Sequence, residues 1–530
     1  MRRRTFIKTA AGTAAAAGAG VFSILKYPRG ANAAGWGTWP TDREDLMIPE
    51  DMRPQSVLEL CFHGGITAWE TFYAVESWGQ DDNTFTNLFN DQGINSPRGY
   101  YEQVCQYGAA NTFVTEFGED SGGTPVGLGP WLYPLKARPD ILARMRILVQ
   151  SHTVLAHEGA NPISFTGDFV GNPRMAGLGA PIQRYFNEQP GGSRAVPYSF
   201  ILYPGGAGFS GFNVGSASAI GFHPGAARPL NVTVSQDSVL ADLLSRPGLA
   251  GVDPDAFDAA VSYYARAYEN RFRSGGVGKV SRSLERANYA FANYARQNAN
   301  ELIEVLPDSL FQPIQGQTCA PGNPEQNLDM PAMMANVARS LLTRETNRAR
   351  YVNWIDTGIF PRPEIGYDVH NEHVLYTARS VPHTMQQLAN IIQDPGQPRD
   401  PTLIDLDQTM VVINMEFGRT PHPQVPGSTG TNHWPFGYVN VVIGGPVRDG
   451  DSRSPGASIY GRIQSPEESS PGYADSASFV TPTENRVMML TALGIYPFSS
   501  QSYAVADVRF RDDEVEALTR VRDELWGISV

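Results

Sequence analysis

Histidine and carboxylate side chains recur just beyond the apolar runs of this sequence, in a pattern that suits a divalent transition metal. Asp368 and His370 alternate in an extended segment and therefore face the same side. His373 lies three residues further, where a helix would bring it beside His370. Glu416 and His433 each flank a predicted strand. Carboxylate oxygens and imidazole nitrogens are common zinc ligands, so these five residues are the predicted metal ligands.

Two other histidines follow predicted strands. His157 lies beyond the second predicted strand, and His63 directly follows the first. The glycine pair Gly64-Gly65 comes directly after His63, and backbone N–H groups in such a segment can approach an anion closely. These segments add candidate catalytic groups to the predicted metal ligands.

Each candidate also has a structural alternative. Asp368 and His370 would then be a turn carboxylate and an ordinary hydrogen-bonded imidazole. Glu416 would form a surface ion pair with Arg419. The other histidines would be packed in the core or would face solvent. The repeated coincidence of these groups with strand ends favours a shared site.

The elements that must position these residues follow from the hydrophobic pattern. Continuous apolar runs predict strands covered on both faces, at 56–62, 146–151, 198–202, 350–355, 409–415 and 438–443. Helical patterns occur at 256–271, 281–305, 332–348, 373–392 and 484–493. Segments rich in glycine and proline predict loops at 119–130, 204–228, 313–328 and 421–430.

This alternation predicts an α/β fold: a three-layer α/β/α sandwich with a mostly parallel central sheet and long loop insertions. In open sheets of this kind, ligands collect at the carboxyl ends of the strands. The candidate residues are therefore expected at one edge of the sheet.

The charge balance argues against a nucleic-acid partner. The 530 residues include 41 Lys+Arg and 54 Asp+Glu, which gives a formal charge of −13. Six of the basic residues lie in the first 29 positions, so the rest of the chain carries 35 basic and 54 acidic residues, a net charge of −19. Such a surface repels phosphate backbones.

Residues 1–33 have the features of an export signal. A basic start is followed by a weakly apolar stretch and by Ala31-Asn32-Ala33, a small-x-small cleavage signal. The segment Arg3-Arg4-Thr5-Phe6-Ile7-Lys8 resembles the twin-arginine signal, although a basic amphipathic N-terminus is an alternative. We expect a signal peptide at 1–33 and a single domain at 34–530, located in the periplasm or secreted. No later run of eighteen apolar residues predicts a membrane span.

Together these segments resemble a bacterial family, domain of unknown function 1501, of the alkaline phosphatase and sulfatase superfamily. The likeness covers nearly the whole mature chain. It rests on the Gly64-Gly65 segment, on Gly366-Tyr367-Asp368-Val369-His370, on Glu416-Phe417-Gly418-Arg419-Thr420-Pro421 and on Gly430-Thr431-Asn432-His433-Trp434.

The resemblance implies a hydrolase of phosphate or sulfate esters with one or two divalent ions, such as zinc, calcium or manganese. It implies Asp368 with His370 as one ligand pair, and Glu416 and His433 as later ligands. The metal would polarise the ester oxygen and acidify a bound hydroxyl or water. Arg419 is suited to the developing oxyanion, and His157 is a further catalytic candidate.

The sequence departs from the family pattern at two places. Asn432 stands where the family usually has aspartate, and the first strand ends without the metal-binding aspartate of the superfamily. Only Thr67 or Thr71 offers a hydroxyl there, so Thr67 is a candidate nucleophile. These departures favour the alternative function, a catalytically degenerate exported protein that binds a polymer or a partner. The resemblance then implies a complex with a protein of the domain of unknown function 1800 family.

Overall fold

The computed structural model describes most of the chain beyond the N-terminus. The described residues are 36–79, 115–172, 176–189, 197–204, 229–234, 253, 256–257, 259–264, 266–267, 304–314, 328–359, 366–370, 373–421, 424, 430–465, 472–498 and 502–529. The predicted signal peptide at 1–33 and nearly all of the helix predicted at 281–305 lie outside these residues. None of the described helices combines the length and hydropathy needed to cross a bilayer.

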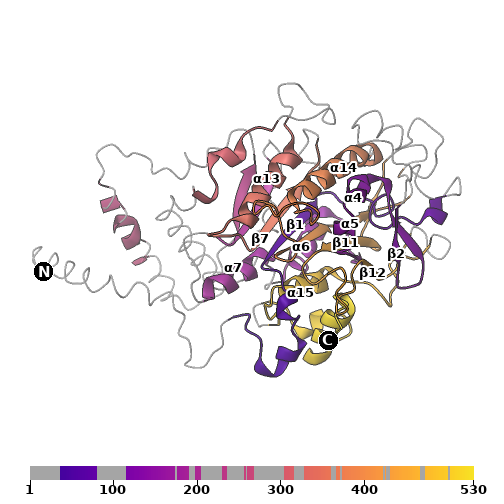
Figure 1. Ribbon diagram of the computed structural model, residues 1–530. Coiled ribbons are helices and arrows are strands. Elements are labelled where there is room, and N and C mark those ends of the chain that lie inside the picture. Colours follow the sequence, from indigo (N-terminus) through magenta and orange to yellow (C-terminus); the bar gives the residue numbers. More distant parts are fainter. Residues whose placement is uncertain are drawn as a thin grey trace, which may run out of the picture.

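An eight-stranded sheet forms the centre of the molecule (Figure 1). Its strand order is β12-β4-β11-β8-β1-β7-β5-β6. All neighbouring strands are parallel except at β11, which is antiparallel to both β4 and β8. The bounds are β1 Ser56–Phe62, β4 Met145–Gln150, β5 Ser199–Pro204, β6 Leu230–Val234, β7 Tyr351–Asp356, β8 Thr409–Met415, β11 Tyr438–Ile443 and β12 Ser458–Tyr460.

Helices cover both faces of the sheet, as Figure 1 shows for α13 and α14 on one side and α15 on the other. One hydrophobic core joins the sheet to α4 Tyr133–Lys136, α5 Pro139–Leu142, α13 Met330–Thr343 and α14 His373–Ile391. A second core on the opposite face joins it to α6 His157–Thr166, α7 Gly179–Glu188, α15 Pro482–Ala492 and α16 Glu514–Thr519. The predicted three-layer sandwich with a mostly parallel sheet is therefore confirmed.

Shorter elements complete the described chain. Two small antiparallel pairs are β2 Thr115–Glu119 with β3 Pro125–Leu128, and β9 Gly418–Arg419 with β10 His433–Trp434. The 3₁₀ helices are η1 Thr41–Leu46, η2 Glu50–Met52, η3 Glu76–Gly79, η4 Pro130–Leu132, η5 Asp308–Phe311 and η7 Val505–Asp507, and a π-helical turn, η8, spans Arg520–Leu525.

The continuous apolar runs predicted the central strands closely, and the misses have physical reasons. The bounds of β1, β8 and β11 are as predicted. The loop prediction at 119–130 was wrong in part, because β3 pairs there with β2 although it begins with a proline. The edge strand β6 alternates between buried and exposed positions, so it has no continuous apolar run. Helix α6 contains Pro162, which masks a helical pattern.

A buried ion pair crosses from the middle of β1 to α15. The Arg486 guanidinium donates two hydrogen bonds to the Glu59 carboxylate, at 2.9 and 2.6 Å. Glu59 and Arg486 are 1% and 0% exposed. The hydroxyl of Tyr351 and the amide of Asn414 also donate to Glu59. Two opposite charges inside a hydrophobic core require each other, because either one alone would be a desolvated charge.

We expect Arg486→Leu to lower the free energy of unfolding by about 3–5 kcal/mol, because Glu59 would remain buried without its countercharge. Urea denaturation measures this loss. Arg453→Leu is the control, because Arg453 bridges Asp51 and Asp451 at the surface and its removal should change little. Equal losses in the two variants would contradict the importance of the buried pair.

Candidate functional site

Most of the predicted site residues meet at one edge of the sheet. Strands β1 and β8 are parallel and end together, so His63 and Glu416, which follow them directly, are neighbours. Strand β4 also ends at this edge, and the chain then turns into α6, which begins at His157. Strand β11 runs the opposite way and starts here, so His433, a few residues before it, reaches the same place.

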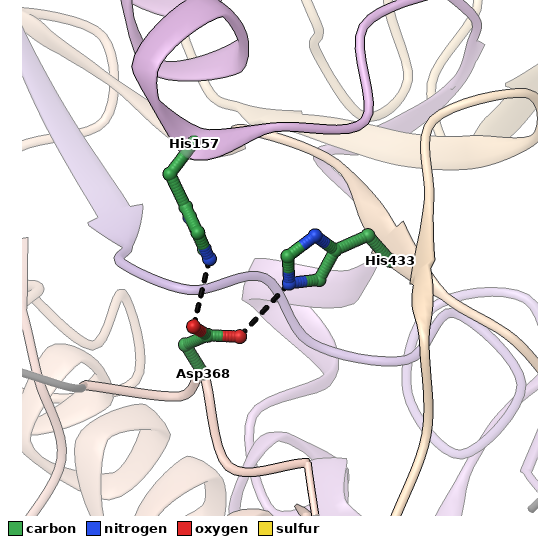
Figure 2. A group of neighbouring side chains, drawn as sticks. All are labelled: His157, Asp368 and His433. Carbon is green, nitrogen blue, oxygen red and sulfur yellow. Dashed lines mark hydrogen bonds and ion pairs between the residues drawn. The ribbon is translucent and has the colours of Figure 1, made fainter. Parts of the chain in front are cut away.

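The carboxylate of Asp368 lies at the centre of this group. Oδ2 of Asp368 is 2.8 Å from Nε2 of His157, and Oδ1 is 2.9 Å from Nε2 of His433. Nε2 of His370 is 3.0 Å from Oδ1. Figure 2 shows the rings of His157 and His433 reaching the carboxylate from separate elements. One ligand atom from each of His157, Asp368 and His433 lies within 4.8 Å of the other two.

The opposite nitrogen, Nδ1, of each ring meets an oxygen acceptor. These pairs are His157 with Glu416 Oε2 (2.8 Å), His433 with the Leu155 carbonyl (2.8 Å) and His370 with Gln424 Oε1 (3.3 Å). Because a carboxylate or a carbonyl can only accept, Nδ1 is the protonated nitrogen in the neutral form of such a ring. The lone pair of each Nε2 atom then faces Asp368.

The placement of an Nε2 lone pair against the carboxylate is clearest at His157. Its Nε2 atom is buried and has no aligned hydrogen bond among the described residues, although Oδ2 of Asp368 is 2.8 Å away. Burial lowers the pKa of His157, but its contacts with Asp368 and Glu416 outweigh this and raise the pKa to about 10. A proton or a cation must therefore lie between the ring and the Asp368 carboxylate.

Glu416 supports His157 from the side away from Asp368. It is 0% exposed, and its Oε1 atom accepts a hydrogen bond of 2.7 Å from the Gly64 N–H. Burial raises the pKa of Glu416, but the contact with His157 lowers it overall. His152 donates from Nε2 to the Glu416 carbonyl at 2.6 Å. Of the predicted metal ligands, Glu416 is thus placed against an imidazole rather than beside Asp368.

Arg419 lies beneath the cluster. It is 1% exposed and donates to Oδ1 of Asp368 at 2.7 Å. Its other N–H groups donate to the carbonyls of Gly64, Thr431 and Tyr367. Burial lowers the pKa of Arg419. The guanidinium is therefore engaged by the protein itself and holds the Asp368 carboxylate in place.

Two predicted site residues, Thr67 and His373, form no hydrogen bond or ion pair with the cluster within the described part of the chain. The Thr67 hydroxyl is buried and accepts a hydrogen bond of 3.2 Å from the Trp69 N–H within its own loop. His373 is fully buried at the start of α14, and its Nδ1 atom lies 3.0 Å from the Tyr367 carbonyl. Burial holds the pKa of His373 well below its ordinary value.

Two glycines allow the segments of the site to touch. Gly64 has φ +99°, and a Cβ atom there would overlap the backbone nitrogen of Asp368. Gly366 has φ +55°, and a Cβ atom there would overlap the carbonyl of His63. The Tyr367 N–H donates to the same carbonyl at 2.7 Å. Only residues without a side chain permit this backbone contact, which places Asp368 next to the end of β1.

A second buried carboxylate, Asp356, lies at the end of β7 behind this contact. Its Oδ2 atom accepts from the hydroxyls of Tyr367 (2.5 Å) and Thr384 (3.0 Å). Its backbone carbonyl accepts from the His63 N–H. Burial raises the pKa of Asp356 to about 6.

The sequence analysis missed several partners of the site. The Leu155 carbonyl and the Gly64 N–H are backbone groups, which leave no signal in the residue types. Gln424 lies in a predicted loop, with no spacing that connects it to His370. The position of His157 after a strand was the available signal for its place in the cluster.

The fold and the site define an α/β sandwich protein with a histidine and carboxylate cluster at the strand ends. The family described as protein of unknown function (DUF1501) matches residues 55–458. This range runs from the start of β1 to β12 and includes the whole cluster, and the chain belongs to this family. No curated protein matches the chain.

We expect Gly64→Ala to lower the urea midpoint strongly, because the new Cβ atom would press on the Asp368 backbone. Gly123→Ala is a matched control. Gly123 also has positive φ, +78°, but a Cβ atom there meets nothing within 4 Å. It should cost only the left-handed strain of about 1–2 kcal/mol. Equal midpoints for the two variants would refute the close approach.

The stability should also depend on the pH through Asp356. Because the folded pKa of about 6 lies above the ordinary value of 3.8, the folded state loses stability as the pH rises from about 4 to about 6. The expected loss is roughly 3 kcal/mol. The unfolding free energy is measured across this range for the wild type and for Asp356→Asn. The wild type should lose stability with rising pH relative to the variant, and parallel profiles of the two proteins would contradict the raised pKa of Asp356.

Proposed function

We propose that the protein is an exported, metal-dependent hydrolase of phosphate or sulfate esters, with a divalent ion held by His157, Asp368, His370 and His433. One observation carries the proposal: three imidazole Nε2 atoms lie within 3.0 Å of one carboxylate, while each Nδ1 atom has an oxygen acceptor of its own. The ester class and the membership of the alkaline phosphatase and sulfatase superfamily rest on the family resemblance.

The residues present fit a metal. Three imidazoles and one carboxylate form a donor set rich in nitrogen, which suits zinc and disfavours calcium. The unsatisfied Nε2 atom of His157 is the kind of buried lone pair that a cation satisfies. Glu416 on the other nitrogen of His157 corresponds to the carboxylate that commonly orients a ligating histidine.

The surrounding protein groups would orient the ligands of such an ion. A bound divalent ion polarises the ester oxygen and lowers the pKa of a water molecule to about 7. Arg419 fixes Asp368, Glu416 fixes His157, and the Leu155 carbonyl fixes His433. His433 also stacks on Phe417, with ring centroids 4.2 Å apart.

The open side of the site is at His370 and Asp368. Their side chains are 36% and 24% exposed, so an ester would approach there. Because the Thr67 hydroxyl is buried in its own loop, we propose water rather than a protein hydroxyl as the nucleophile.

The placement of Arg419 favours a second candidate function, that of a binding protein without hydrolytic activity. Its guanidinium is buried and engaged by Asp368 and three carbonyls, so it does not serve an oxyanion on the open side. Asn432, which replaces the usual aspartate of the family, agrees with this alternative. The periplasmic or secreted location and a partner of the domain of unknown function 1800 family belong to both candidates as proposals.

The metal content of protein purified without chelator tests the donor set. We expect bound zinc or a similar ion in the wild type, and an affinity loss in His157→Gln and His433→Gln. This loss should exceed the roughly 10- to 100-fold cost of removing an outer hydrogen-bond partner. His383→Gln is the matched control, because His383 pairs with Asp329 outside the cluster and its loss should leave metal binding intact. A metal-free wild type would refute the proposal.

Hydrolysis separates the two candidate functions. Aryl phosphate and aryl sulfate esters are assayed with added zinc, manganese or calcium. Turnover that disappears in His157→Gln and persists in His383→Gln supports the hydrolase. Inactivity of a wild type that holds its metal supports the binding protein.

A further inference from the structure

A group of buried polar side chains lies behind the candidate site, between the sheet and helices α6 and α15. We call it the polar seam. Its members are Gln150, Asn161, Tyr438, Asn440, Asn485 and Arg486. All are at most 1% exposed. Each has at least one polar side-chain atom without a hydrogen-bond partner in the described part of the chain, and Asn161 has two.

The strands bring one end of the seam together. Tyr438 and Asn440 alternate along β11 and so share a face of the sheet, and Gln150 is the partner of Tyr438 in the neighbouring β4. The Asn440 amide donates to Oδ1 of Asn414 at 3.1 Å, and the Asn414 amide donates to Glu59 at 2.7 Å. The seam is thereby continuous with the buried pair of Glu59 and Arg486.

Helix α6 connects the polar seam to the candidate site. His157, Asn161 and Ser164 are spaced by four and three residues, so they lie on one face of the helix. His157 contacts Glu416, and the Ser164 hydroxyl donates to the Met415 carbonyl at 3.1 Å. Asn161 lies between them and therefore faces the end of β8.

Tyr438 lies near the end of β8, because its ring meets the ring of His152 edge-on, with centroids 5.5 Å apart, and His152 donates to the Glu416 carbonyl. Burial raises the pKa of Tyr438, while the positive charge of Arg486 lowers it and the negative charge of Glu416 raises it. Both charges thus act on one buried hydroxyl.

Seven polar atoms with no partner among the described residues, all in one buried region, would be too costly for a folded domain, whose net stability is small. Native proteins satisfy such atoms with ordered water. Amide, hydroxyl and guanidinium groups supply both the donors and the acceptors that a water molecule needs.

We infer that ordered water molecules fill the polar seam and link Tyr438 and Asn161 to the rear of the Glu416 carboxylate. Glu416 can accept these bonds, since each carboxylate oxygen takes more than one. The described residues that meet its carboxylate are Gly64 and His157, which form hydrogen bonds with it, and His63, whose Nδ1 atom lies 3.8 Å from Oε1. Tyr438 and Asn161 are then positioning residues for His157. The consequence for a bound metal rests on the proposed function.

The sign of a stability change tests the water-filled seam. In protein stripped of metal by a chelator, Tyr438→Phe should lower the apparent melting temperature by about 1–4 °C, because the water would lose a partner. If the hydroxyl is buried without water, the same variant should instead be more stable. Asn161→Leu repeats the test on α6. Tyr503→Phe calibrates the size, because its hydroxyl donates directly to the Thr166 carbonyl at 2.6 Å.

The metal affinity tests the positioning role. Competition with a chromophoric chelator should show weaker zinc binding in Tyr438→Phe, by less than the roughly tenfold to hundredfold cost of losing a direct outer partner. With cobalt in place of zinc, the absorption bands of Tyr438→Phe should be shifted from those of the wild type. A purely structural role of Tyr438 would leave the bands unchanged. Higher melting temperatures in both Tyr438→Phe and Asn161→Leu would overturn the seam, and unchanged affinity and spectra would overturn the positioning role. If the wild type binds no metal, the proposed function fails, while the melting temperatures still decide the seam.

Discussion

One carboxylate, that of Asp368, is shared by three imidazole rings and a guanidinium, and the arrangement of the site follows from this sharing. When the rings are neutral, three Nε2 lone pairs face this one negative charge, which is unfavourable in a partly buried position. The rings must either share protons with it or surround a cation. Because each Nδ1 atom already has an acceptor, the electron pairs of the three Nε2 atoms face the Asp368 carboxylate.

The two acidic residues of the cluster, Asp368 and Glu416, have different roles because their surroundings differ. Asp368 keeps 24% of its side chain exposed and lies at the mouth of the site. Glu416 is completely buried and is held by the Gly64 N–H and by His157. A buried carboxylate with a fixed hydrogen-bonding pattern orients an imidazole, whereas a partly exposed one remains accessible to a ligand.

The sheet beneath the site is unusually polar for the centre of a sandwich. Glu59 and Arg486 form an ion pair there, and Asn414 and Asn440 extend its hydrogen bonds across three adjacent strands, β1, β8 and β11. Such groups cost stability when they are unpaired, so their geometry is tightly constrained. This constraint lies two residues along β8 from Glu416 and ties the backbone of the site to the core.

The sequence by itself determined the strands and the edge at which the site lies. Continuous apolar runs locate β1, β8 and β11. Glu416 was recognisable because it follows such a run and His433 because it precedes one, while Asp368 and His370 were recognisable by their alternate spacing. Only the tertiary structure decided which side chain faces which. His157 lies beside Asp368 because α6 starts there, and Glu416 pairs with the Gly64 N–H and with His157. The close backbone approach of Gly64 to Asp368 brings these segments together. Side-chain direction after a strand depends on such long-range contacts, which the order of residues along the chain does not contain.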